Sequence, residues 1–116
     1  MIEFTILGEP ASKANSRQLV TINGRPAFIK SKKARDYMKA AQMQAALACG
    51  IVLFEGPVRL TARIYYASQR PDLDASVILD ALQGYAYAND RQVREMHLFH
   101  AIDKANPRAE IQVEPI

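Results

Sequence analysis

The stretch VRLTARIYYA, residues 58–67, decides the fold of this chain. Apolar side chains occupy every second position from Val58 onward, and most of the positions between them are polar. This alternation predicts a β-strand with one face in the core and the other face exposed. Gly56-Pro57 precedes the strand and SQRPDLD (68–74) follows it, so turn residues bound it at both ends.

The residues after this strand predict a helix and two further strands. ASVILDALQ (75–83) predicts a helix whose first turn begins at Asp74 and which ends at Gly84. VREMHLFHAI (93–102) and AEIQVE (109–114) are typical of strands, and these last two can pair antiparallel. The residues expected to face the core from the helix are Val77, Ile78, Ala81 and Leu82.

The residues before the central strand predict a strand, a hairpin and a long helix. IEFTIL (2–7) is the strand, and LVTINGRPAFIK (19–30) is a β-hairpin turning at Asn23-Gly24, a dipeptide typical of type I′ turns. The helix covers 32–49, with Ser31 as its N-cap and Gly50 as its stop. Its expected buried stripe is Ala34, Tyr37, Met38, Ala41, Ala45 and Cys49.

This order predicts an α+β fold in a single domain over residues 1–116, with two helices packed on one face of a mixed β-sheet. The chain is 49% hydrophobic and 23% charged, which excludes a disordered or coiled-coil protein. The N-terminus lacks the pattern of a secretory signal, and no apolar stretch is long enough to span a membrane. The single Cys49 cannot form an internal disulfide, so we expect a cytoplasmic protein.

Charge is unevenly distributed along the chain. Residues 1–39 contain eight Lys and Arg against three acidic residues, whereas residues 40–116 contain seven against nine. A basic segment of this kind indicates a surface that faces a polyanion, most simply a nucleic acid. A solvated helix face is an equally good explanation of the charge alone.

The segment with the clearest candidate catalytic residues is the acidic one after the central strand. Asp72 and Asp74 lie two residues apart in extended backbone, so their side chains point to the same side. Asp90 follows sixteen residues later, before the next strand, and joins them if the two strands are neighbours. Three carboxylates suit Mg²⁺ or Mn²⁺, and such ions support phosphodiester hydrolysis. The alternative is that Asp72 and Asp74 are only turn and cap residues.

Other chemistries have less support. His97 and His100 are three residues apart in a predicted strand, so they face opposite sides and cannot share an ion. Ser12 and Ser16 have no evident histidine partner, and the sequence has no Gly-rich phosphate loop. Four tyrosines flank the acidic segment, where they could stack on bases, although about two of them are expected to pack in the core: Tyr65, Tyr66, Tyr85 and Tyr87.

As one string, RPDLDASVILDALQGYAYANDRQV (70–93) resembles the signature of the RusA-type Holliday-junction resolvases, often carried by phages and prophages. That signature has an R-x-D-x-D-N-x-x-K helix start, a D-A-L-x-G helix end, and an acidic pair before a Q-V/I strand. It matches here at Arg70, Asp72, Asp74, Asp80, Ala81, Leu82, Gly84, Tyr87, Asp90, Gln92 and Val93. The family's G-x-P…K…R opening is similar to Gly8, Pro10, Lys13 and Arg17.

The resemblance implies a homodimeric, Mg²⁺-dependent endonuclease that binds four-way DNA junctions and cuts two opposed strands. Asp72, Asp74 and Asp90 would be its metal-binding catalytic carboxylates. An isologous dimer would present two equivalent sites to a nearly symmetric junction. Because an acidic pocket alone repels phosphate, we expect basic residues to flank it on one face: Lys13, Arg17, Arg70, Lys32 and Lys33.

The chain departs from the family pattern at three positions. Ala75 replaces the Asn after the second Asp, Ile78 replaces the catalytic-region Lys, and Asn89 replaces an acid often found before the third Asp. Loss of the lysine removes a cation that could stabilise the transition state. Two alternatives therefore stay open: a junction-binding protein with weak or lost cleavage, and a prophage-encoded relic of the fold with an interaction role.

Overall fold

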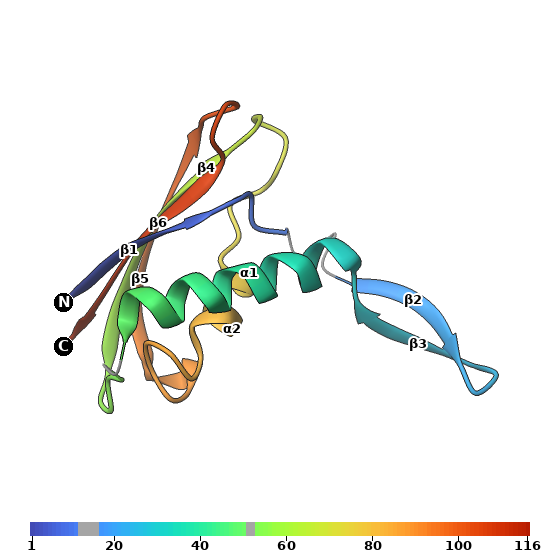
Figure 1. Ribbon diagram of the computed structural model, residues 1–116, viewed down its shortest axis with the longest axis horizontal. Helices are drawn as coiled ribbons and strands as arrows, with labels where there is room; N and C mark the ends of the chain where they lie inside the picture. The colour runs from blue at the N-terminus through green and yellow to red at the C-terminus, as the bar shows by residue number, and fades with distance from the viewer. Residues whose placement is uncertain (12–16, 51–52) are drawn as a thin grey trace.

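The sheet is built around β4 (Val58–Tyr66), the strand whose alternating pattern is clearest in the sequence. The computed structural model describes residues 1–11, 17–50 and 53–116, and its main sheet has the order β1-β6-β4-β5 (Figure 1). β1 (Ile2–Leu7) pairs antiparallel with β6 (Arg108–Pro115), and β6 pairs antiparallel with β4. β5 (Val93–Ile102) pairs parallel with β4, so the sheet is mixed, as predicted.

The expected pairing of the last two strands is wrong. β6 lies between β1 and β4, and β5 forms the sheet edge on the other side of β4. After β5 the chain crosses the end of β4, where the Asp103 N–H donates to the Tyr66 carbonyl oxygen at 2.8 Å. This crossing gives β6 a strand on each side. Its alternate residues are buried because one face of the strand faces the core: Ala109, Ile111 and Val113.

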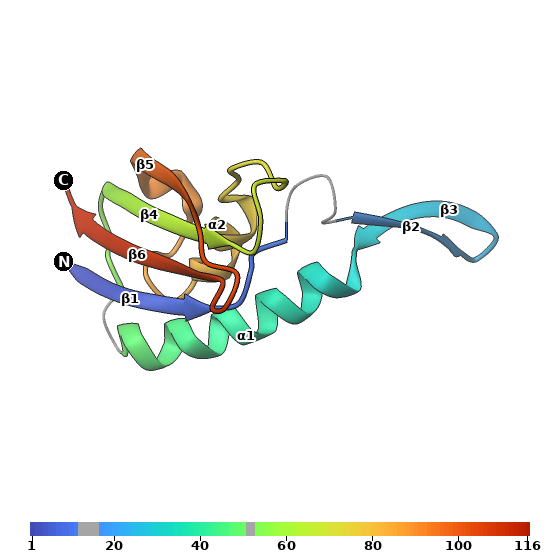
Figure 2. The ribbon, with the colours of Figure 1, turned by 90° about the horizontal axis from the view of Figure 1, so that it is seen from above.

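Both helices cover the same face of the sheet, as the sequence predicts (Figures 1 and 2). α1 (Lys32–Cys49) begins at Ser31, whose Oγ accepts the Ala34 N–H at 3.2 Å, and ends at Gly50 with a positive φ of 58°. α2 (Ser76–Leu82) follows β4. The buried residues on the helices include every predicted core residue except Met38, which is half-buried, and they pack against the alternate residues of β4: Val58, Leu60, Ala62, Ile64 and Tyr66.

A second sheet consists of the predicted hairpin, β2 (Arg17–Ile22) and β3 (Arg25–Lys30). Asn23 and Gly24 both have positive φ, 52° and 76°, as a type I′ turn requires. Figures 1 and 2 show this hairpin projecting away from the main sheet and the helices. Its strands therefore lie outside the core that the four-stranded sheet forms with the two helices.

The other face of the main sheet carries no helix and is polar, as the alternation of β4 predicts. Arg59 pairs there with Glu95 at 2.9 Å and with Glu114 at 3.0 Å, while Arg63 lies 4.8 Å from the centre of the Phe99 ring. Among the described residues, no helix is long and apolar enough to cross a membrane.

Candidate active site

Tyr66, the last residue of β4, fastens the acidic segment to the sheet. Its side chain is buried, and its hydroxyl donates to the Asp72 carbonyl oxygen at 3.1 Å and accepts the Asp74 N–H at 3.2 Å. Burial raises the pKa of this hydroxyl, and the negative charges of Asp74, Glu9 and Asp72 act in the same direction. Three carboxylates therefore lie around one buried phenol at the end of the central strand.

The Asp74 carboxylate also organises the start of α2. Its Oδ1 accepts the Ser76 N–H at 2.9 Å and the Ser76 hydroxyl. This is the turn-forming role that a short acidic side chain plays before a helix. The Asp72 carboxylate, in contrast, is on an exposed residue. The Tyr66 hydroxyl thus holds the backbone of both residues, while the Asp74 carboxylate is oriented by the start of α2 and Asp72 is exposed.

Glu9 is a third acidic residue at this place, and it is not among the predicted site residues. Its Oε1 accepts the Ala67 N–H at 2.9 Å, and its Oε2 pairs with Lys33 Nζ at 3.4 Å. Glu9 therefore connects the segment after β1 to the end of β4 and to the first turn of α1. Its position between Gly8 and Pro10 in the opening motif was the available signal.

Asp90 lies apart from this group. It begins the short 3₁₀ turn Asp90–Gln92 before β5, and its N–H donates to Gln83 Oε1 at 3.1 Å, beyond the far end of α2. Because β4 and β5 are parallel, the start of β5 lies beside the start of β4. Within the described ranges, no three His, Cys, Asp or Glu residues are grouped to hold a metal ion. The shared site of all three Asp residues stays a prediction.

The turn that carries Asp90 is held by the two residues around it in the motif. Asn89, which stands where the family often has an acid, accepts the Arg91 N–H at 2.9 Å and caps the turn. Gln92 Nε2 donates to the carbonyl oxygens of Phe54 at 2.7 Å and Gly56 at 3.0 Å. Both side chains therefore have structural roles that fix the turn against the entry to β4.

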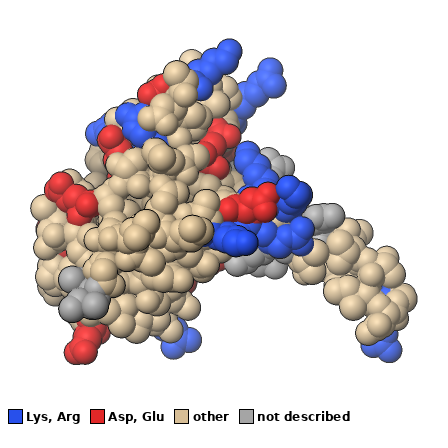
Figure 3. Space-filling view, in the orientation of Figure 1, with Lys and Arg blue, Asp and Glu red and all other residues tan. Residues whose placement is uncertain are grey.

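The site's cations do not come from α2. Ile78 is fully buried, so the position of the family's lysine lies within the core of this chain. Lys33 reaches the site through Glu9, and Arg70 is exposed two residues before Asp72. Figure 3 shows Lys and Arg intermixed with Asp and Glu near the start of α1.

The remaining predicted basic residues are placed as follows. Lys32 pairs with Asp36 at 3.1 Å on the exposed surface of α1. Arg17 is the first residue of β2. Lys13 lies outside the described residues, as do Ser12 and Ser16. That all five cations flank the acidic segment stays a prediction.

The two histidines face opposite sides of β5, as predicted. His97 pairs with Glu95 at 2.7 Å and, together with Arg59, lowers the pKa of that carboxyl. His100 stacks on Tyr66 with ring centres 4.8 Å apart, and its Nε2 lies 3.2 Å from the Pro71 carbonyl oxygen. His100 therefore contacts both Tyr66 and the acidic loop, a role that its place in the predicted strand did not indicate.

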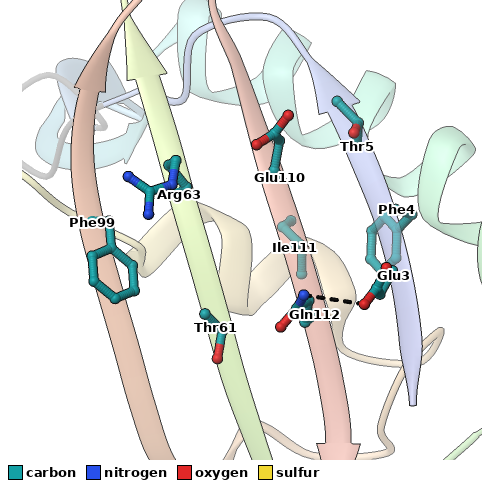
Figure 4. Close-up of a pocket in the computed structure, with 9 residues that line it drawn as sticks. All are labelled: Glu3, Phe4, Thr5, Thr61, Arg63, Phe99, Glu110, Ile111 and Gln112. Atoms are coloured by element: carbon teal, nitrogen blue, oxygen red, sulfur yellow. Dashed lines mark hydrogen bonds between the residues drawn. The ribbon is translucent and has the colours of Figure 1, made fainter.

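A hollow on the helix-free face of the sheet contains none of the predicted residues. Thr61, Arg63 and Phe99 line one side of it, and Glu3 accepts a hydrogen bond from Gln112 Nε2 at 3.1 Å on the other (Figure 4). Arg63 contacts Phe99, and Gln112 contacts Glu3, each pair from neighbouring strands. The candidate site is therefore the loop after β4, on the helix-covered side.

The chain matches the model of a known protein family. The model of the family described as Endodeoxyribonuclease RusA matches residues 8–114. Of the helices and strands in the described residues, this range leaves out β1 and the last residue of β6. No curated protein matches the chain.

Proposed function

Because the chain belongs to the RusA family of endodeoxyribonucleases, a family that resolves Holliday junctions, we propose that it binds four-way DNA junctions as a homodimer and cleaves them by Mg²⁺-dependent phosphodiester hydrolysis. The observation that supports an active site in the loop after β4 is that the Tyr66 hydroxyl holds the backbone of Asp72 and Asp74 there. Paired carboxylates held by a rigid strand are suited to catalysis.

Nucleases of this family generally depend on a divalent metal. Mg²⁺ commonly binds through one or two carboxylates and fills its other positions with water and substrate phosphate. Asp72 and Asp74 offer this donor set, with Asp72 exposed at the surface, so these residues fit the ion and would hold it. When bound, such an ion lowers the pKa of water and stabilises the leaving oxygen.

The surrounding residues would position the carboxylates and receive the DNA. The Tyr66 hydroxyl holds the backbone at Asp72 and Asp74, and Ser76 orients the Asp74 carboxylate. Because Ile78 cannot supply a cation, Arg70 and Lys33 would stabilise the negative charge of the phosphate. We assign phosphate contact also to Lys13, Arg17 and Lys32.

We propose Asp90 as the third catalytic carboxylate, contributing to the metal site when DNA is bound. Because α2 separates Asp90 from Asp72, the Asp90→Asn variant tests its role independently of the pair. We expect Asp90→Asn to lose Mg²⁺-dependent cleavage while still binding junctions. Cleavage by Asp90→Asn at the wild-type rate would contradict this role of Asp90 and leave Asp72 and Asp74 as the proposed catalytic carboxylates.

The proposed activity is tested with a labelled four-way junction beside a linear duplex of the same sequence, with and without Mg²⁺. We expect paired cuts in the junction only, and only with the metal. Sedimentation equilibrium on the free protein should give twice the 12.9 kDa chain mass. Cleavage of both substrates alike, or of neither, would contradict the proposal.

A second candidate is a junction-binding protein of the same fold with weak or lost cleavage. The burial of Ile78 favours it, because the missing family lysine cannot be replaced at that position without disrupting the core. Tight junction binding with no cuts in either Mg²⁺ or Mn²⁺ would support this candidate over the first.

A further inference from the structure

The β2–β3 hairpin, residues 17–30, is an arm that the core does not need. In the described part of the chain its strands pair only with each other, and the arm projects from the body (Figure 2). Each strand has six residues and so spans roughly 20 Å. Because a lone two-stranded hairpin is marginally stable in water, an arm of this kind gains stability from a surface on which it lies.

The arm carries the whole net charge of the protein. Residues 17–30 contain three basic residues and no acidic one, whereas the rest of the chain contains 12 basic and 12 acidic residues. Figure 3 shows Lys or Arg at the tip of the arm and no Asp or Glu along it. A ribbon whose charged residues are all basic, on a molecule with no other net charge, is complementary to a polyanion.

The arm also exposes apolar side chains in register. Leu19 and Phe28 are directly opposite each other on the two strands, so they share one face, and they are 61% and 69% exposed. Ile22, at the end of β2, is 49% exposed. An exposed aromatic ring on a basic surface is suited to stacking on bases or to insertion between base steps.

We propose that this arm is a DNA-binding ribbon, which lies along a groove of the junction with Arg25 on the phosphate backbone and Phe28 against the bases. The major groove of B-DNA is wide enough for a two-stranded β-ribbon. The inference rests on the proposed binding of branched DNA and names a surface for it away from the carboxylates. The basic charge of the arm favours DNA as its partner over a second copy of this chain, because the rest of the chain has no net charge.

The test compares the arm with a matched pair elsewhere on the surface. Arg25→Gln and Phe28→Ala are measured for junction affinity over a range of salt concentrations. Arg63→Gln and Phe99→Ala are the controls, since this exposed Arg and Phe lie in contact on the helix-free sheet face. Loss of one phosphate contact lowers the steepness of the log–log salt dependence by about one. Loss of one stacked base weakens binding by roughly 5- to 150-fold.

We expect Arg25→Gln to lower the salt dependence and Phe28→Ala to weaken binding, while both controls bind within about twofold of the wild type. Wild-type affinity in both arm variants would overturn the inference but leave the proposed function standing. If Phe28→Ala instead converts a dimer into a monomer in sedimentation, the arm is a subunit contact and the inference is wrong. A wild-type protein that binds no junction contradicts the proposed function itself.

Discussion

Replacement of Tyr66 by Phe should slow cleavage strongly while the protein stays folded. The change keeps the buried ring and its stacking on His100 but removes the hydroxyl that contacts the acidic loop at 3.1 and 3.2 Å. Each of these two hydrogen bonds contributes roughly 0.5–1.5 kcal/mol net, and the freed groups of this partly exposed loop are rehydrated. We therefore expect the free energy of unfolding to fall by about 1–3 kcal/mol.

Catalysis should depend on this hydroxyl because it holds the backbone of both carboxylate-bearing residues in place. A displacement of about 1 Å in a catalytic group can cost roughly a hundredfold in rate. Tyr87→Phe is the matched control: its ring is also fully buried, and its hydroxyl donates to the Leu79 carbonyl oxygen at 2.7 Å within α2. The control should lose similar stability and retain its cleavage rate.

The assay measures urea unfolding and single-turnover junction cleavage for the wild type and both variants. Wild-type cleavage by Tyr66→Phe, or an equal loss of cleavage in both variants at conditions where both are folded, would refute the anchoring role of Tyr66.

Three further outcomes follow from the packing. Ile78→Lys places an ammonium group in the fully buried core and should lower the free energy of unfolding by more than about 3 kcal/mol without increasing cleavage, as chemical denaturation and the junction assay can show. Ser31→Ala removes the cap that accepts the Ala34 N–H and should cost about 1 kcal/mol in the same denaturation assay, whereas unchanged stability would contradict the capping role. Burial raises the pKa of both Tyr66 and Tyr87, so their hydroxyls lose protons more readily in the unfolded state than in the folded state. The free energy of unfolding should therefore be unaffected by these groups below about pH 10 and should fall as the pH rises further. Urea unfolding midpoints at neutral and alkaline pH can check this.

Local patterns in the sequence predicted most of the helices and strands because each pattern depends on residues that lie close together in the chain. The alternation of β4, the caps of α1 and the Asn23-Gly24 turn are local signals, and all three are confirmed. The family resemblance carried by residues 70–93 is confirmed as well. Of the four tyrosines beside the acidic segment, Tyr66 and Tyr87 are fully buried, in line with the expected division.

Strand pairing and convergence of distant residues were harder to predict because they depend on direction. The sequence indicates that β5 follows β4, but a helix between them makes the strands parallel, and the start of β5 then lies far from the end of β4. That direction places Asp90, just before β5, near the start of β4, whereas Asp72 and Asp74 follow its end, so the site shared by all three stays a proposal. Likewise, the insertion of β6 beside β4 and the projection of the hairpin depend on contacts between segments distant in the chain.

The most direct test of the central claim is cleavage of a four-way junction in Mg²⁺ by the wild type and by Asp72→Asn, with junction binding measured in parallel. The variant keeps the shape of the exposed side chain but removes one carboxylate charge from the proposed metal site. We expect the wild type to cleave and Asp72→Asn not to cleave, while the variant binds the junction as tightly or more tightly because a repulsive charge is gone. Cleavage by Asp72→Asn at the wild-type rate would contradict the account.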